Sequence, residues 1–182
     1  MLQEPDVSST TKPRVYIFPT FKEEKNIDEL PASKVTLKEL VLAETVIPLY
    51  NEMCTTCENS SFAQEWIEHS GESGLSVFHV GQGSTAYDKW EPIYIGTNSE
   101  PIYDEMLSLE GKREKIVQMY TLCLKGYEFH VLDNAFLVYR PGSTKHKLWH
   151  RDMFVAEQYT FIKEELIPRY LTMFKEDEKC YI

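Results

Sequence analysis

The sequence predicts a mixed α/β fold that ends in a long helix. Short β-branched and aromatic runs bounded by Pro, Gly or Asn predict strands. Between them lie stretches whose apolar residues recur at i, i+3, i+4 and i+7, the spacing of one helix face. The two patterns alternate along 182 residues without an internal repeat, so we expect one domain with a mixed sheet and flanking helices.

The predicted strands are short and are separated by turn residues or charged stretches. They lie at residues 15–18, 76–80, 92–95, 127–132 and 135–139. The last two flank the turn pair Asp133-Asn134. The charged stretch 21–30 is predicted to be an exposed connection. Residues 81–87 are predicted to form a mobile loop, and the aromatic stretch around this loop is where we expect a ligand.

Four helices are predicted. The first spans about 36–47 and follows a capping-box spacing from Thr36 to Glu39, and the second is a short helix capped by Ser60 or Ser61. The third spans 112–124 and ends at Gly126 in the C′ position. The apolar stripe of the long C-terminal helix consists of Val155, Tyr159, Ile162, Leu166 and Tyr170.

Composition limits the classes of function. The chain has 29 acidic and 19 basic residues and a net charge of −10, which excludes nucleic acid as the default partner. With 42% hydrophobic and 13% aromatic residues it can bury a core of its own. Residues 1–13 are expected to be a disordered N-terminus, and 14–182 the folded domain. The chain as written is expected to carry no targeting signal and no membrane anchor.

The cysteines leave two interpretations open. Cys54, Cys57, Cys123 and Cys180 fit free thiols in a reducing compartment or one or two disulfides in an oxidising one, and the pairing is not determined. The Cys54-x-x-Cys57 pair could bind zinc with two histidines. However, His69 and His79 are further apart than the usual spacer of three to five residues, and no second such pair exists, which disfavours zinc.

Three ordered motifs carry a resemblance to a known family. They are Trp90-Glu-Pro-Ile-Tyr-Ile95, Tyr103-Asp-Glu105 and Gly126-Tyr-Glu-Phe-His-Val-Leu-Asp-Asn-Ala-Phe-Leu-Val138. Their order and spacing resemble the C-terminal half of glycosyltransferase family 49. The resemblance covers roughly residues 14–171 and is most specific from 90 to 138.

The resemblance implies a GT-A fold, of which this chain would be the C-terminal part. It also implies transfer of a sugar, glucuronic acid in the relatives, from a UDP-sugar donor to a glycan acceptor. Mn²⁺ would be the cofactor of a full-length form, and the location would be the Golgi, with a type II membrane anchor outside this chain.

Two departures from the family pattern concern the metal site. The Asp-x-Asp pair that holds the metal in such enzymes does not occur in this sequence, and in the family it lies upstream of the matching stretch. Tyr139 stands where the family has its late metal-binding His, and a phenol with a pKa near 10 is a poor Mn²⁺ ligand. We therefore assign no metal ligand, and expect this chain alone to bind no Mn²⁺ and to be inactive.

The resemblance also suggests site residues. Glu91 and Asp104 are the candidate catalytic carboxylates, because an inverting transferase needs a base for the acceptor hydroxyl. Each could instead be a structural carboxylate. The candidate substrate-binding residues are Trp90, Tyr94, Tyr103, Asn134 and His146. The aromatic rings could stack on sugars or simply pack in the core. The basic patch that includes His146 could meet a phosphate or a uronic acid, or could be a solvated turn.

Two other functions remain open. The chain could be a non-catalytic relative that binds a glycan or a partner enzyme, which the missing Asp-x-Asp pair and Tyr139 favour. It could also be a small cytosolic domain whose likeness to the family arose by chance. Mn²⁺-dependent UDP binding would separate the catalytic from the non-catalytic alternative.

Overall fold

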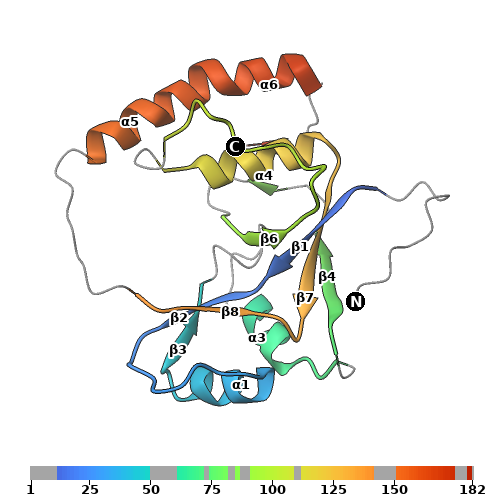
Figure 1. Cartoon of the computed structure of the whole chain (residues 1–182), viewed down its shortest axis with the longest axis vertical. Coiled ribbons are helices and arrows are strands. Elements are labelled where there is room, and N and C mark those ends of the chain that lie inside the picture. Colours follow the sequence, from blue (N-terminus) through green and yellow to red (C-terminus); the bar gives the residue numbers. More distant parts are fainter. Residues whose placement is uncertain are drawn as a thin grey trace.

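A computed structural model gives the structure of the chain (Figure 1). It describes residues 12–49, 61–71, 74–81, 85–86, 91–108, 112–141, 151–174 and 180–181. Residues 1–11, which make up most of the predicted disordered terminus, therefore lie outside the described residues. So do four side chains on which predictions were made, namely Cys54, Cys57, Trp90 and His146.

The larger sheet has four strands in the order β4-β7-β1-β6. They are β4 (Ser76–Gly81), β7 (Glu128–Asp133), β1 (Arg14–Phe18) and β6 (Ile93–Ile95). The two central strands, β1 and β7, are parallel, and both edge strands are antiparallel to their neighbours. Val15 and Ile17 of β1 are fully buried, as the apolar run of this strand predicts. The strands predicted at 15–18, 76–80, 92–95 and 127–132 are thus confirmed.

Both central strands continue into a second sheet of order β3-β2-β8. Its strands are β3 (Val46–Pro48), β2 (Thr20–Glu23) and β8 (Leu137–Tyr139). After Pro19 the chain passes from β1 into β2, and after Asn134 it passes from β7 into β8, which lies parallel to β2. The predicted turn at Asp133-Asn134 exists, with Asn134 at φ 58°, but its two strands do not pair with each other. The turn therefore carries the chain from one sheet to the next.

The prediction that residues 21–30 form an exposed connection is wrong for its first part. β2 is a central strand, and Phe21 is fully buried against the ring of Trp66. The many charged residues of this stretch favoured an exposed connection, so the strand was not predicted. Glu23 is nevertheless buried, because its carboxylate accepts hydrogen bonds from the Ile27 backbone N–H (2.7 Å) and from Arg140 Nε (2.7 Å).

The first helix, α1 (Lys34–Leu42), is shorter and begins earlier than predicted. Its N-cap is Ser33, whose hydroxyl accepts from the backbone N–H of Thr36. The helix ends in a Schellman motif in which Thr45 N–H donates to Leu40 O and Glu44 N–H to Val41 O. Glu44 takes the left-handed conformation (φ 52°) that Gly usually supplies, so the stop was not visible in the sequence. Residues 46 and 47, predicted to be helical, belong to the strand β3 instead.

The second helix, α3 (Ser61–Glu68), is confirmed, although its predicted capping side chains lie outside the described ones. The third, α4 (Glu114–Leu124), is also confirmed and is buried from Ile116 to Leu124. Gly126 (φ 75°) ends α4 as predicted, with Tyr127 N–H donating to Leu122 O and Gly126 N–H to Cys123 O.

A disulfide links α4 to the C-terminal end of the chain. It joins Cys123 to Cys180, which lies in β9 (Cys180–Tyr181). β9 pairs in parallel with β5 (Thr85–Ala86), so part of the predicted loop 81–87 is a strand. The oxidised alternative for the cysteines is thus confirmed for this pair.

The long C-terminal helix is present but contains a wider turn. It consists of α5 (Arg151–Phe161), the π-helical turn η2 (Ile162–Leu166) and α6 (Ile167–Phe174), and it lies above α4 in the view of Figure 1. The π turn precedes Pro168, which lacks an N–H and whose ring crowds the preceding turn. Ile162, Leu166 and Tyr170 of the predicted stripe are buried. No helix in the described part of the chain is long and apolar enough to span a membrane.

Candidate functional site

Glu91 lies just before β6, at the end of the sheet where β1 and β7 lead into the second sheet. Ile93 is paired with Phe18 at the last position of β1, which fixes this placement. The side chain is half-buried, and no hydrogen bond or ion pair joins its carboxylate to another described residue. Of the two predicted catalytic carboxylates, only Asp104 is hydrogen-bonded to other described residues.

Asp104 is engaged within the chain. One carboxylate oxygen accepts from the backbone N–H of Met106 (2.9 Å), and the other accepts from the hydroxyl of Tyr170 in α6 (2.7 Å). Burial and the hydrogen bond to Asp104 raise the pKa of Tyr170 well above its usual value, so this hydroxyl stays a donor. Asp104 thus links the 101–108 segment to α6, an arrangement typical of a structural carboxylate.

Tyr94 and Tyr103 lie together beside α4. The Tyr94 hydroxyl accepts a hydrogen bond from Gln118 Nε2 (3.1 Å), and the same amide donates to the carbonyl of Pro101 (2.6 Å). Gln118 is only 3% exposed, so α4 fixes both contacts from the interior. Burial raises the pKa of Tyr103, and the neighbouring Tyr94 and Glu114 raise it further. The part of the Tyr103 ring that remains exposed could stack on a sugar.

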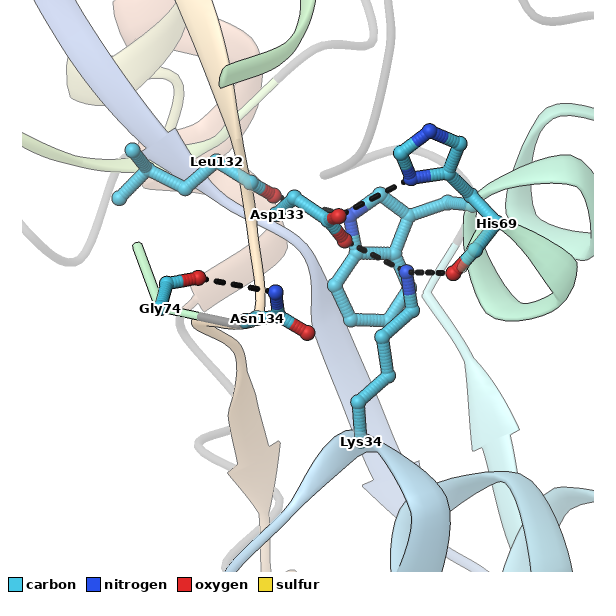
Figure 2. A network of polar contacts seen from close by, with 7 residues as sticks. Lys34, His69, Gly74, Leu132, Asp133 and Asn134 are labelled. Atoms are coloured by element: carbon cyan, nitrogen blue, oxygen red, sulfur yellow. Dashed lines mark hydrogen bonds and ion pairs between the residues drawn. The ribbon is translucent and has the colours of Figure 1, made fainter. Parts of the chain in front are cut away.

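Asn134 belongs to a polar network that the sequence did not reveal (Figure 2). Its side chain donates to the carbonyl of Gly74 (2.9 Å). The preceding residue, Asp133, is fully buried at the end of β7. One Asp133 carboxylate oxygen lies 2.5 Å from Lys34 Nζ and the other 3.0 Å from His69 Nδ1. The network therefore joins α1, the end of α3 and the crossover between the two sheets.

Lys34 is held on several sides. Its Nζ also donates to the backbone carbonyl of His69 (3.0 Å) and lies 4.2 Å from the ring centroid of Trp66. Trp66 in turn donates from its indole N–H to the carbonyl of Leu132 (2.8 Å). The ammonium thus replaces its hydration with a carboxylate, a carbonyl and an aromatic face.

The contacts of Asp133 keep it ionised. Burial acts to raise its pKa, but hydrogen bonds from Lys34 and His69 outweigh burial, and the pKa is lowered overall. Gly71 contributes by having no side chain, because a Cβ there would lie 2.2 Å from Asp133 Oδ2. The sequence signal for this network was small: one acidic residue ends a mostly buried strand, and its partners lie far away along the chain.

The structure separates the predicted site residues into two groups. Tyr94, Tyr103 and Asp104 lie beside α4 and α6, as their hydrogen bonds show. Glu91 and Asn134 form the second group. They lie at one end of the four-stranded sheet, on either side of β1. Trp90 and His146 are outside the described residues.

The described side chains do not fit a Mn²⁺ site. Tyr139 is 53% exposed on β8. No group of three His, Cys, Asp or Glu side chains able to hold a metal occurs among the described residues. The buried carboxylates of Asp133 and Glu23 already face the cations of Lys34 and Arg140. We therefore derive no chemical step that uses a metal in this part of the chain.

Comparisons with known proteins define the class as glycosyltransferase. The family described as glycosyl-transferase for dystroglycan matches residues 1–175, so the chain belongs to this family. β-1,4-Glucuronyltransferase 1 of Danio rerio is 35% identical over 126 residues, which are 69% of this chain and 28% of the relative.

Mammalian relatives give the same result over more of the chain. β-1,4-Glucuronyltransferase 1 of Homo sapiens is 28% identical over 159 residues, which are 85% of this chain and 37% of that protein. The Mus musculus protein is 30% identical over 146 residues, which are 78% of this chain and 34% of the relative. The chain therefore spans about a third of the length of these curated relatives. The resemblance to glycosyltransferase family 49 is confirmed.

Proposed function

We propose that this chain forms the acceptor-binding part of a glycosyltransferase that transfers glucuronic acid from a UDP-sugar to a glycan. The observation that carries the proposal is the carboxylate of Glu91, which makes no hydrogen bond or ion pair with another described residue, in a chain of this family. The names of the relatives support glucuronic acid as the sugar transferred. The mixed sheets and the long C-terminal helix are compatible with part of a GT-A fold.

In this proposal Glu91 acts as the base. Its carboxylate accepts the proton of an acceptor hydroxyl while that oxygen bonds to the anomeric carbon of the donor sugar. The bond between that carbon and the diphosphate breaks, and UDP leaves with the electron pair. The exposed part of Tyr103 and the segment at Asn134 would contact the acceptor sugars.

The donor side of the proposed reaction is incomplete or degenerate in this sequence. The sequence contains no Asp-x-Asp pair, and the described residues do not fit Mn²⁺. A metal would neutralise the charge of the leaving diphosphate, and we assign that role to residues outside this chain.

The proposed location is the Golgi lumen. The relatives are glycosyltransferases, and the disulfide between Cys123 and Cys180 supports an oxidising compartment. The disulfide ties together segments 57 residues apart, so it is part of the fold.

The test compares two variants in glycoside binding. Isothermal titration of the chain with p-nitrophenyl β-glycosides of neutral sugars should give saturable binding. Glu91→Gln should weaken it about tenfold or more, because a hydrogen bond to a charged group is lost. Glu100→Gln is the matched control, since its carboxylate already accepts from the Thr97 backbone and hydroxyl. Absence of glycoside binding, or equal effects of the two variants, would overturn the proposal.

A second candidate is a non-catalytic relative that binds a glycan or a partner enzyme, and Tyr139 favours it. In a longer polypeptide that contains this chain, Tyr139→His should strengthen Mn²⁺-dependent UDP binding if the residue occupies a ligand position. Unchanged metal affinity, together with retained glycoside binding and no transfer of glucuronic acid, would favour the non-catalytic alternative.

A further inference from the structure

His69 stands out among the described histidines because a fully buried carboxylate orients its ring (Figure 2). We propose that His69 is a glycan-binding residue whose Nε2 accepts a hydrogen bond from a sugar hydroxyl of the acceptor. This inference rests on the proposed function and adds a binding position to it. Neither the family motifs nor the predicted site residues include His69.

The first argument concerns the tautomer of the ring. Asp133 can only accept at His69 Nδ1, 3.0 Å away, because the carboxylate stays ionised between Lys34 and the imidazole. The Nδ1 atom must therefore carry the hydrogen. In the neutral ring the lone pair is then on Nε2, which makes that atom an acceptor. The same device, in which a carboxylate holds one ring nitrogen, orients imidazoles that bind through the other nitrogen.

The second argument concerns access to Nε2. The His69 side chain is 44% exposed, whereas Asp133 beneath it is fully buried. The described contacts of His69 use its backbone, its Nδ1 atom and its ring, which meets the Phe78 ring edgewise at 5.1 Å between centroids. None of these contacts involves Nε2.

The third argument is that charge balance does not require this histidine. Lys34 alone neutralises Asp133, with Nζ 2.5 Å from the carboxylate and a side chain that is only 9% exposed. A hydrogen-bonding role for the imidazole is therefore separate from the ion pair. Gly71 lies close beside the ring, since a Cβ there would lie 3.2 Å from His69 Cε1.

The fourth argument is the position of the network relative to Glu91. Asp133 and the segment of Glu91 lie at the same end of the four-stranded sheet, separated by β1. Two strand spacings separate them, or about 10 Å. This is the spacing of the two strands, so under the proposed function an acceptor glycan held at Glu91 would have to extend across β1 to reach His69. The Nε2 atom of the neutral ring can accept a hydrogen bond from a sugar hydroxyl. It cannot donate a hydrogen bond to the diphosphate of a nucleotide sugar.

The experiment begins with the unaltered chain. Imidazole-detected ¹H–¹⁵N correlation spectra of the neutral ring, recorded at alkaline pH, should show His69 protonated at Nδ1. Addition of a p-nitrophenyl β-glycoside should shift the Nε2 resonance of His69. A ring protonated at Nε2, or an Nε2 resonance that does not move at saturating glycoside, would overturn the inference without any mutation.

Two variants complete the test. His69→Gln keeps an amide that can donate to Asp133 but loses the rigid ring that fixes an acceptor at the position of Nε2, and we expect glycoside affinity to fall about threefold to tenfold. His79→Gln is the matched control, because His79 is also exposed and contacts Phe62 rather than a carboxylate. Its affinity should stay within twofold of the unaltered chain.

The outcomes separate this inference from the proposed function. If the unaltered chain binds no glycoside, the proposed function and this inference are both overturned. If the unaltered chain binds and His69→Gln binds equally well, only the inference about His69 is overturned.

Discussion

The substitution Asp133→Asn should destabilise the chain strongly. In the native structure the carboxylate is fully buried and faces Lys34 Nζ at 2.5 Å and His69 Nδ1 at 3.0 Å. Asparagine keeps the size and one acceptor oxygen but removes the negative charge. The ammonium of Lys34 then remains in a mostly buried position without a counter-ion, and the amide N–H₂ of asparagine faces a ring N–H.

The expected loss follows from the cost of an unpaired buried charge. Removing one partner of a buried ion pair costs about 3–5 kcal/mol. The carbonyl of His69 and the ring of Trp66 still contact Lys34, which places the expected loss near the lower end, about 3 kcal/mol. For a chain of this size that corresponds to a fall in Tm of about 6–12 °C.

Urea denaturation measured by tryptophan fluorescence is a suitable assay, because Trp66 is buried beside Lys34. The control is Glu24→Gln, which removes the acid from the exposed pair with Lys22 and should change stability by less than about 1 kcal/mol. If Asp133→Asn changed stability no more than this control, the network would not stabilise the fold and our reasoning about it would be wrong.

Three further predictions concern the same structure. Gly71→Ala should lower the free energy of unfolding in urea by about 1–3 kcal/mol, because the new Cβ would meet Asp133 Oδ2. The control Gly81→Ala should lower it clearly less, since its neighbours are at ordinary distances. Equal losses would contradict the close approach at Gly71. The pKa values of Asp133 and Glu23 are lowered in the fold, so their stabilisation is complete above the unfolded pKa of about 4 and is lost as the pH falls through the folded values. Denaturation between about pH 5 and pH 2 should show this fall, and Asp133→Asn should make it shallower; an unchanged slope would refute the assignment. Cys180→Ala should cost about 2–4 kcal/mol, since it opens a linkage between residues 57 apart, and a reducing agent should destabilise the unaltered chain but not the variant.

Much of the fold could be predicted from local sequence patterns. The strand at 15–18 and the helix ended by Gly126 have standard signals, and both are present. The errors occurred where a distant partner decides the structure. Glu23 can be buried because the Ile27 backbone N–H and Arg140, which lies far along the chain, both donate to its carboxylate. The helix that ends at Leu42 stops with Glu44 in a conformation that a non-glycine residue seldom adopts.

The candidate site was less predictable than the fold. Motif order identified the family and pointed to Glu91 and Asp104, but hydrogen bonding distinguishes the two, since Tyr170 and Met106 occupy the oxygens of Asp104. The network of Asp133, Lys34 and His69 has no local signature, because its members come from three separate elements. Only the folded structure brings these residues into contact.

The most direct test of the account titrates one sample of the chain with two ligands. The account predicts saturable binding of a p-nitrophenyl β-glycoside, and no binding of UDP-glucuronic acid that depends on Mn²⁺. Mn²⁺-dependent binding of UDP-glucuronic acid without glycoside binding would contradict it, because the chain would then carry the donor side of the reaction rather than the acceptor side.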